Sequence, residues 1–443
     1  MKLWDKGTDL NRQIEAFTVG RDRELDLELA PWDVLGTLAH ITMLTEIGLL
    51  EKHEFQVLRA ELWSIYRKTL MGSFKIEEGV EDVHSQVEMM LTEKLGTIGK
   101  KVHSGRSRND QVLVDLKLYF IHTIERLVAQ VEELFTALQL QAERYKNHLL
   151  PGYTHMQVAM PSSFGLWFGA YAEALIDDVQ MLAAAFKVAD QNPLGSGAGY
   201  GSSFPLNRTR TTELLGFETL SYNVVYAQMG RGKTERLYGY ALASLASTLN
   251  KFASDACTYM SQNMGFISLP DELTTGSSIM PHKKNPDVFE ILRARTNRLQ
   301  GLPQEMALIT TNLPSGYHRD LQLTKEVLLP AITETKLCLE ITTFMVGQIQ
   351  VKPKIMEDPK YAYTFSVEVV NALVLQGIPF REAYQMVGKS IEKGEFLPPQ
   401  EVKHTHEGSI GQLNQEEIKQ KFEKAKRQMD VARFDQAWEN LLK

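Results

Sequence analysis

Hydrophobic residues recur with a helical period through most of the chain, and one stripe is longer than the others. It starts at Leu113 and advances in steps of three and four residues, the spacing of one face of an α-helix. A stripe sustained over about seven turns predicts a helix from near residue 110 to near residue 148, on the order of 55 Å long. Such a length is typical of a helical bundle and favours one shared between chains. The stripe consists of Leu113, Leu116, Phe120, Ile124, Leu127, Val131, Leu134 and Leu138.

The same periodicity predicts further helices that begin after recognisable start signals. Pro161 and the two serines after it mark a helix that continues until Pro193. Another helix is predicted from about residue 234 to residue 263, one follows Asp287, and one follows the loop LPSGYHRD and continues to about residue 347. No convincing alternating strand pattern occurs between residues 110 and 350. These features predict an all-α protein.

Proline positions predict how the rest of the chain is divided. Breaks at residues 353, 359, 379 and 398–399 indicate shorter helices after Val351, and the first 105 or so residues also read as shorter helices. We therefore expect three domains. They are an N-terminal helical domain (1–105), a central long-helix bundle (106–350) and a small C-terminal helical domain (351–443).

Composition narrows the class of protein. The net charge is -7 and no long basic run occurs, which argues against nucleic acid as a partner. The N-terminal stretch MKLWDKGTDLNRQ lacks the apolar centre of a signal peptide, and no stretch reaches the roughly 18 apolar residues of a membrane span. The two cysteines, Cys257 and Cys338, do not suggest a disulfide framework. We expect a cytoplasmic protein with no membrane partner.

Two motifs could suggest a bound ligand, but each has a simpler interpretation. His404 and His406 form an isolated pair with no carboxylate or cysteine at metal-ligand spacing, so the sequence predicts no metal site. The glycine-rich segment NPLGSGAGYGSSFP (192–205) follows a predicted helix, whereas a dinucleotide-binding loop follows a strand. A compact glycine turn is the expected structure there.

Polar loops between the long helices carry the candidate chemistry. The segment VHSGRSRNDQV (102–112) places Ser107, Arg108 and Asn109 just before the longest helix. One interpretation is helix capping by Asn109 or Asp110. The other is a carboxylate site, in which these donors act beside the positive end of the helix.

Three later loops contain further candidates. PGYTHMQ (151–157) places a histidine, whose charge can switch near neutral pH, in the break between two core helices. TTGSSIMPHKKNPD (274–287) combines hydroxyls, an apolar wedge and two lysines, and we expect Asp287 to cap the helix after it. In SGYHRDLQLTK (315–325), Gln322 and Lys325 share one helix face, which is either solvated or part of a site.

These loops together resemble a known superfamily. GSSIMPHKKNP is similar to the signature of the fumarase/aspartase superfamily. Within it, EDVH (81–84), SGRSRNDQV (104–112), GYTHMQ (152–157) and YHRDLQ (317–322) resemble the argininosuccinate lyase family. The resemblance extends from about residue 15 to the C-terminus.

The resemblance implies a fold, a reaction and an assembly. The implied fold is all-helical with three domains, and its long central bundle is completed by tetramerisation, with each active site assembled from three chains. The implied reaction is the reversible β-elimination of argininosuccinate to L-arginine and fumarate, a step of arginine biosynthesis that needs no cofactor. The expected partners are therefore a small-molecule substrate and further copies of the chain.

The resemblance also assigns roles to individual residues. Ser277 is implied as the base that takes the proton next to a carboxylate, and Lys283 as the cation that stabilises it and the carbanion. His155 is the second catalytic residue, and Glu290 is the carboxylate that orients it. The implied substrate-binding residues are Asn109, Thr154, Asn285, Tyr317, Gln322 and Lys325, with Ser107, Arg108 and His84 in matching loops.

Several positions depart from the family pattern. His282 stands where the family usually has glutamine, and Thr18 or the Gly20 backbone stands where it has a serine. The segment NVVYAQMGRG keeps only Asn223, Ala227 and Arg231 of a longer family motif. The alternatives are therefore another fumarate-releasing lyase, of the adenylosuccinate type, or an inactive structural relative.

Overall fold

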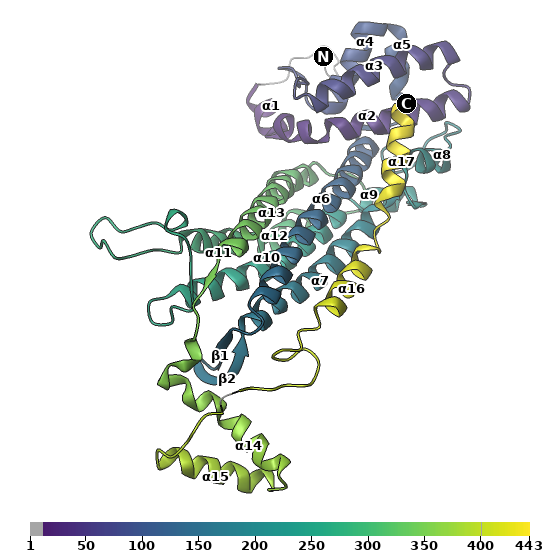
Figure 1. Cartoon of the computed structure of the whole chain (residues 1–443). Helices are drawn as coiled ribbons and strands as arrows, with labels where there is room; N and C mark the ends of the chain where they lie inside the picture. Colours follow the sequence, from purple (N-terminus) through teal and green to yellow (C-terminus); the bar gives the residue numbers. More distant parts are fainter. Residues whose placement is uncertain (1–11, 400) are drawn as a thin grey trace.

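The computed structural model describes residues 12–399 and 401–443, so the N-terminal stretch that was searched for a signal peptide lies largely outside the described residues. Figure 1 shows a long bundle of helices with a cap of shorter helices at one end and a small helical lobe at the other. The predicted all-α class is confirmed, since the strands are few and short. The strands are β1 (Leu149–Thr154), β2 (Gln157–Ser163), β3 (Gln191–Asn192), β4 (Thr219–Leu220), β5 (Ile267–Ser268) and β6 (Gln350–Val351).

The predicted long helix is α6 (Arg108–Arg144), which runs through the centre of the bundle. Every member of its predicted hydrophobic stripe, from Leu113 to Leu138, is at most 3% exposed. The helix starts with a capping box: the Ser107 hydroxyl accepts from the amide of Asn109, and the Asp110 carboxylate accepts from the amide of Ser107. The loop does cap the helix, but the cap residue is Ser107 and not Asn109 or Asp110 as predicted; Asp110 completes the capping box.

The other predicted long helices surround α6. Ser163 caps α7 (Phe164–Ala189) by accepting from the amide of Leu166. The remaining bundle helices are α10 (Lys233–Met260), α11 (Asp287–Leu299), α12 (Leu302–Thr310) and α13 (Leu323–Gln348), with the turn η3 (Arg319–Gln322) leading into the last. The predicted cap on α11 is wrong, because the Asp287 carboxylate accepts from the Thr275 hydroxyl instead of a helix amide.

One element was missed by the sequence analysis. The segment between α6 and α7 is not a simple break but an antiparallel hairpin of β1 and β2. Its register shifts between Pro151 and Tyr153, so the alternation of buried and exposed positions that identifies a strand is interrupted. His155 and Met156 form the turn with φ values of 52° and 60°. The hairpin lies at the end of the bundle opposite the cap (Figure 1).

The N-terminal cap is built from helices that cross the end of the bundle. The helix α2 (Asp22–Glu46) packs against α3, α4 and α6, and its buried face continues the main hydrophobic core. The cap elements are α1 (Arg12–Val19), α2, α3 (Lys52–Leu70), α4 (Val83–Leu95), α5 (Thr97–Lys100) and the turn η1 (Lys101–His103). Two short helices, α8 (Arg208–Leu215) and α9 (Val224–Met229), lie near the same end.

The C-terminal segment extends to the distal end of the molecule and then returns along the bundle to the cap. The helices α14 (Ser366–Leu375) and α15 (Phe380–Glu392) form the distal lobe around a small core of Val370, Ala383 and Val387. The chain then returns: α16 (Gln415–Lys426) packs along α7, and α17 (Val431–Leu442) packs on α2 and α8. Residues after 414 therefore belong to the main core. The three-domain division remains a prediction. It places residues 351–443 in one C-terminal domain and does not describe this return of the chain to the bundle.

The lobe is joined to the bundle by β6 and two short turns, η4 (Ile355–Glu357) and η5 (Pro359–Phe365). A further turn, η2 (Asp271–Leu273), lies between β5 and α11. Within the described part of the chain, no helix combines the length and the apolarity that crossing a membrane requires.

Candidate active site

The predicted site residues fall into three groups at different places on the molecule. One group lines a cleft where the cap meets the bundle, a second lies on the loop before α11, and the third lies at the tip of the β1–β2 hairpin. In Figure 1 these places are the upper end, the projecting loop on the left and the lower end of the bundle. A single chain therefore does not bring all the predicted residues together.

The cleft has a volume of about 330 Å³ and collects most of the predicted substrate-binding residues. It lies between α2, the start of α4, the start of α6 and the turn into α13. A hollow of about 540 Å³ between α11, α12 and α13 is larger but contains no predicted site residue. The cleft is lined by Asp22, Asp26, Glu81, Asp82, His84, His103, Ser107, Arg108, Asn109, Val112, Arg231, Tyr317, Arg319, Gln322 and Lys325.

The loop of Ser107, Arg108 and Asn109 is held in place by the glycine-rich turn. One Asp110 oxygen accepts from the amide of Ser107 at 2.8 Å, and the other accepts from the amides of Gly195 and Gly197 at 2.9 Å each. Gly195 has a φ of +83°, and a Cβ there would lie 2.8 Å from the Arg208 side chain. The segment is a compact glycine turn, as predicted, and its amides bind a buried carboxylate of the protein itself.

The arginines of the cleft already form ion pairs with acidic side chains. Arg108 forms ion pairs with Glu81, at 3.1 Å, and with Asp82. The other Glu81 oxygen lies 2.6 Å from Arg319, whose guanidinium also donates to the carbonyl of Thr18. Burial opposes ionisation of Glu81, but the two arginines outweigh it and lower the pKa of this carboxyl to about 2. Glu81 thus stays charged and holds the two arginines together.

Lys325 is a deeply buried cation of the cleft. Its amine lies 2.6 Å from Asp26 and 2.8 Å from Asp22, and the side chain is 4% exposed. Burial raises the pKa of Asp22 to about 6, although Lys325 opposes that rise. The amide of Gln322 donates to the carbonyls of Thr18 and Val19, so this predicted site residue also anchors the end of α1.

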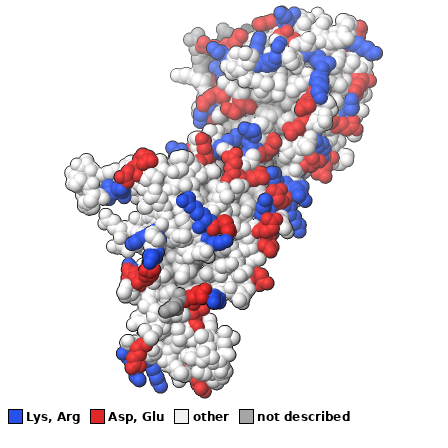
Figure 2. Space-filling model, in the orientation of Figure 1, with Lys and Arg blue, Asp and Glu red and all other residues white. Residues whose placement is uncertain are grey.

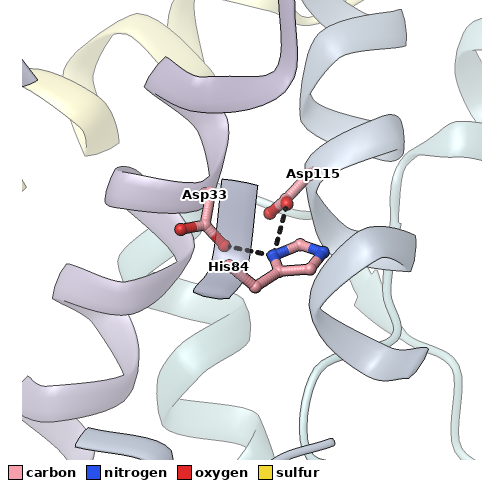
Figure 3. Close-up of side chains that lie close together, drawn as sticks. All are labelled: Asp33, His84 and Asp115. Atoms are coloured by element: carbon pink, nitrogen blue, oxygen red, sulfur yellow. Dashed lines mark hydrogen bonds and ion pairs between the residues drawn. The ribbon is translucent and has the colours of Figure 1, made fainter. Parts of the chain in front are cut away.

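His84 lies at the back of the cleft in a buried cluster (Figure 3). Its Nδ1 is 2.6 Å from an oxygen of Asp33 and 3.5 Å from an oxygen of Asp115. These three residues form a group of possible metal ligands within 4.8 Å, which the sequence analysis did not identify. Burial lowers the pKa of His84, but the charges of Asp33 and Asp115 outweigh it, and the net change is a raised pKa.

The loop before α11 projects from the side of the bundle and is pinned at its base. Thr275 and Asn285 pair across it, with the Asn285 amide 2.8 Å from the Thr275 carbonyl. The Ser277 hydroxyl oxygen, near the middle, accepts from the amides of Ile279 at 3.3 Å and Met280 at 3.1 Å. Ile279 is 82% exposed, so in one chain the apolar wedge covers nothing.

The charged side chains of this loop differ in their partners. Lys284 forms an ion pair with Asp271, whereas Lys283 forms none within the described chain. The side-chain amide of Asn285 donates to Thr275 and to the Gly276 carbonyl at 3.3 Å each. The structure therefore leaves Lys283 available to a ligand and uses Asn285 to close the base of the loop.

The predicted partnership of His155 and Glu290 is not formed within one chain. His155 and Thr154 are exposed at the tip of the hairpin, and Glu290 is exposed in the first turn of α11. The two side chains make no ion pair with each other in the described residues. The resemblance places both residues in one site. The fold of a single chain separates them, because the hairpin lies at the far end of the bundle.

Several acidic residues of the cleft were missed as site residues. Asp22, Asp26 and Asp33 lie on the buried face of α2, at spacings of four and seven residues. The sequence does show carboxylates on the apolar face of this helix. Such a position indicates a partner for the carboxylate, because charged residues are rarely buried without one. The partners, Lys325 and His84, lie far away in the sequence and could not be inferred.

Comparison with known proteins identifies the fold and the family. A protein family described as lyase matches residues 22–301. The crystal structure of EDDS lyase in complex with formate superposes with a TM-score of 0.76 at 22% identity, and the match covers 98% of this chain and 94% of that one. The family model covers more than half of the chain, so this predominantly helical chain is a lyase of that family.

Sequence relatives define the family more narrowly. The argininosuccinate lyase of Bacteroides thetaiotaomicron is 63% identical over 417 residues, which is 94% of each chain. That of Bacteroides fragilis is 61% identical over 441 residues and covers 100% of this chain and 99% of its own. The chain belongs to the argininosuccinate lyase family.

Proposed function

We propose that the chain catalyses the reversible cleavage of argininosuccinate to L-arginine and fumarate. In the forward direction a base takes a proton from the carbon next to a carboxylate. The electrons of that bond are held by the carboxylate as a dianion and then form the double bond of fumarate. The carbon–nitrogen bond breaks, its electrons go to the guanidino nitrogen, and a proton donor completes arginine.

The surroundings of Ser277 carry this proposal. A serine hydroxyl is a poor base unless its alkoxide is stabilised, and two backbone amides already donate to the Ser277 oxygen. Lys283, which has no ion-pair partner among the described residues, supplies the positive charge for that alkoxide and for the dianion. Asn285 is assigned to a substrate carboxylate, for which its side-chain amide has to exchange the bonds to Thr275 and Gly276 that close the base of the same loop.

The cleft residues bind the rest of the substrate. Asn109, Ser107 and Arg108 lie at the N-terminal end of α6, where the helix dipole favours an anion. Tyr317, Gln322 and Lys325 face them from the turn into α13. We assign His155 and Thr154 to the same site, with Glu290 orienting His155 for proton delivery.

This assignment requires more than one chain. The three groups of residues lie at the end, side and opposite end of the bundle, and we propose a homotetramer whose active sites each combine residues from three chains. The bundle helices α10 to α13 expose large apolar side chains, and much of the bundle surface in Figure 2 is uncharged. These side chains are Tyr240, Ile291, Leu308, Leu323, Leu337, Ile341 and Phe344.

A cytoplasmic location is part of the same proposal. It is supported by the two cysteines, of which Cys338 is buried and Cys257 half-buried, and neither forms a disulfide.

An assay of fumarate release tests the reaction. Purified protein is mixed with argininosuccinate, and the ultraviolet absorbance of fumarate is followed over time, with adenylosuccinate as the comparison substrate. We expect release from argininosuccinate alone. Release from adenylosuccinate without release from argininosuccinate would overturn the substrate assignment, and no release from either would overturn the proposed activity.

A further inference from the structure

We infer that Asp33 and Asp115 are positioning residues that hold His84 as a cationic hydrogen-bond donor toward an anionic group of the substrate. The inference rests on the proposed function, because it assigns a task to a residue at the back of the proposed substrate cleft. It concerns the two carboxylates behind the histidine, which have no assigned role.

The geometry gives the two ring nitrogens different surroundings. Both carboxylates lie on the Nδ1 side of the imidazole, at 2.6 Å for Asp33 and 3.5 Å for Asp115 (Figure 3). The opposite nitrogen, Nε2, points away from them (Figure 3), and the hydrogen bond that the ring forms within the described residues is the one at Nδ1. Because His84 lines the cleft and both carboxylates lie on its Nδ1 side, Nε2 is the ring nitrogen left for a bound molecule.

The charge balance favours a proton on each ring nitrogen. Asp33 and Asp115 are each 2% exposed or less, and the second oxygen of Asp33 has no hydrogen-bond partner. A buried carboxylate needs a cation or a donor close by, and a doubly protonated imidazole provides both. The other charged or titratable groups near the cluster are Asp26 on α2, His103 in η1 and the half-buried Arg106. Burial raises the pKa of Asp115 well above its ordinary value, so Asp33 is the main charged partner of His84.

The position of its partners distinguishes His84 from three other cations of the cleft; a fourth, Arg231, is paired with Glu235, which does not line the cleft. Arg108, Arg319 and Lys325 are paired with carboxylates that line the same cleft. The partners of His84 lie behind the ring, so its charge is balanced without covering Nε2. A substrate carboxylate can therefore accept from Nε2 without first displacing a carboxylate of the protein.

A metal ion is the other possible occupant of the cluster, and the distances argue against it. Two ligand atoms bound to one tetrahedral zinc ion at about 2.1 Å lie about 3.4 Å apart. The 2.6 Å between His84 and Asp33 is shorter than this and matches a charge-assisted hydrogen bond.

Substitution of the carboxylates tests the inference in the full-length enzyme. For Asp33→Asn we expect kcat/KM for argininosuccinate to fall about tenfold to a hundredfold, mainly through KM, since a charge-assisted hydrogen bond is lost. The pH above which kcat/KM declines should shift downward by about one unit or more, because His84 then loses its proton more readily. Asp115→Asn should cause a smaller change in the same direction, since its oxygen is farther from Nδ1.

Asp178→Asn is the matched control. Asp178 is also a buried carboxylate, 2% exposed, but it lies on α7 and bonds to Ser244. We expect its kcat/KM and pH profile to remain as in the wild type. If Asp33→Asn retains the wild-type KM and pH profile while the wild type releases fumarate, the inference is overturned and the proposed function stands. If the wild type releases no fumarate, the proposed function itself fails.

A measurement on the wild type covers the case in which Asp33→Asn does not fold. Selective labelling of histidine with nitrogen-15, assigned with a His84→Gln variant, reports the protonation of both ring nitrogens by NMR. Imidazolium signals for His84 at about neutral pH support the inference. Signals of a neutral ring, or a metal ion that copurifies with the enzyme and is lost in Asp115→Asn, would overturn it.

Discussion

Replacing Lys325 by methionine should destabilise the protein in a way that depends strongly on pH. The substitution keeps a chain of similar volume but removes the amine that lies 2.6 Å from Asp26 and 2.8 Å from Asp22. Two carboxylates, 1% and 7% exposed, then remain buried without their cation. Removing one partner of a buried ion pair typically costs about 3–5 kcal/mol, and we expect a loss of this size above neutral pH.

The pKa of Asp22 determines how the loss varies with pH. Burial already raises this pKa from 3.8 to about 6 in the wild type, and without Lys325, which opposes the rise, it increases further. A carboxyl whose pKa is raised in the folded state favours folding while it is protonated, and this contribution disappears as the pH rises through the folded pKa. In the variant Asp22 remains protonated to a higher pH. The loss should therefore shrink to about 1–2 kcal/mol near pH 5.5 and grow between there and about pH 8.

Urea unfolding followed by circular dichroism at about pH 5.5 and about pH 7.5, at one protein concentration, measures this difference. The matched control is Lys117→Met. Lys117 is also buried, but its amine donates to the backbone carbonyl of Gln191 at 2.8 Å and has no carboxylate ion-pair partner in the described chain. Burial lowers the pKa of Lys117 to about 8, so the amine is mostly charged at both pH values and its loss should differ little between them. An equal loss for Lys325→Met at both pH values would refute the reasoning.

Three further predictions follow from the site. Ser277→Ala should lower kcat about a thousandfold or more with little change in KM. The control Ser278→Ala should keep kcat within about twofold of the wild type. A comparable turnover for both variants would show that Ser277 is not the base. Mixing inactive Ser277→Ala and His155→Gln subunits should restore part of the activity, and hybrids that assemble but stay inactive would contradict the shared site. Asp110→Asn should lower the free energy of unfolding by about 2–3 kcal/mol and raise KM, because the carboxylate accepts three backbone amides. Urea unfolding and fumarate release measure these effects, and unchanged values would show that the glycine turn does not position the Ser107 loop.

Local patterns were sufficient for the helices and failed for the hairpin. The stripe from Leu113 to Leu138 predicted the centre of α6, since each position depends only on neighbours three or four residues away. The β1–β2 hairpin has no such regularity, because a register shift interrupts its alternation. His155 was therefore expected in a plain break between helices, whereas it occupies a turn with positive φ.

The candidate site was partly visible in the sequence. The loops around Ser107 and Tyr317 were identified from their polar clusters, and the structure joins them in one cleft. His84 was expected to bind substrate, but the structure shows that one face of it is engaged by Asp33 and Asp115. The contact between His84 and Asp33 joins residues 51 apart in the sequence, so a periodic pattern of neighbouring residues does not predict it.

The sequence by itself determined the helical class, the long central helix and the family signature, because these depend on residue types at short spacing. Only the tertiary structure decided which charges meet. Lys325 reaches Asp26 across 299 residues, and Arg319 reaches the carbonyl of Thr18 across 301. The tertiary structure also places Ser277, His155 and the cleft at different positions along the bundle. The physical reason is that a helix about 55 Å long fixes distances along its axis, while the pairing of buried charges depends on how distant segments pack around it.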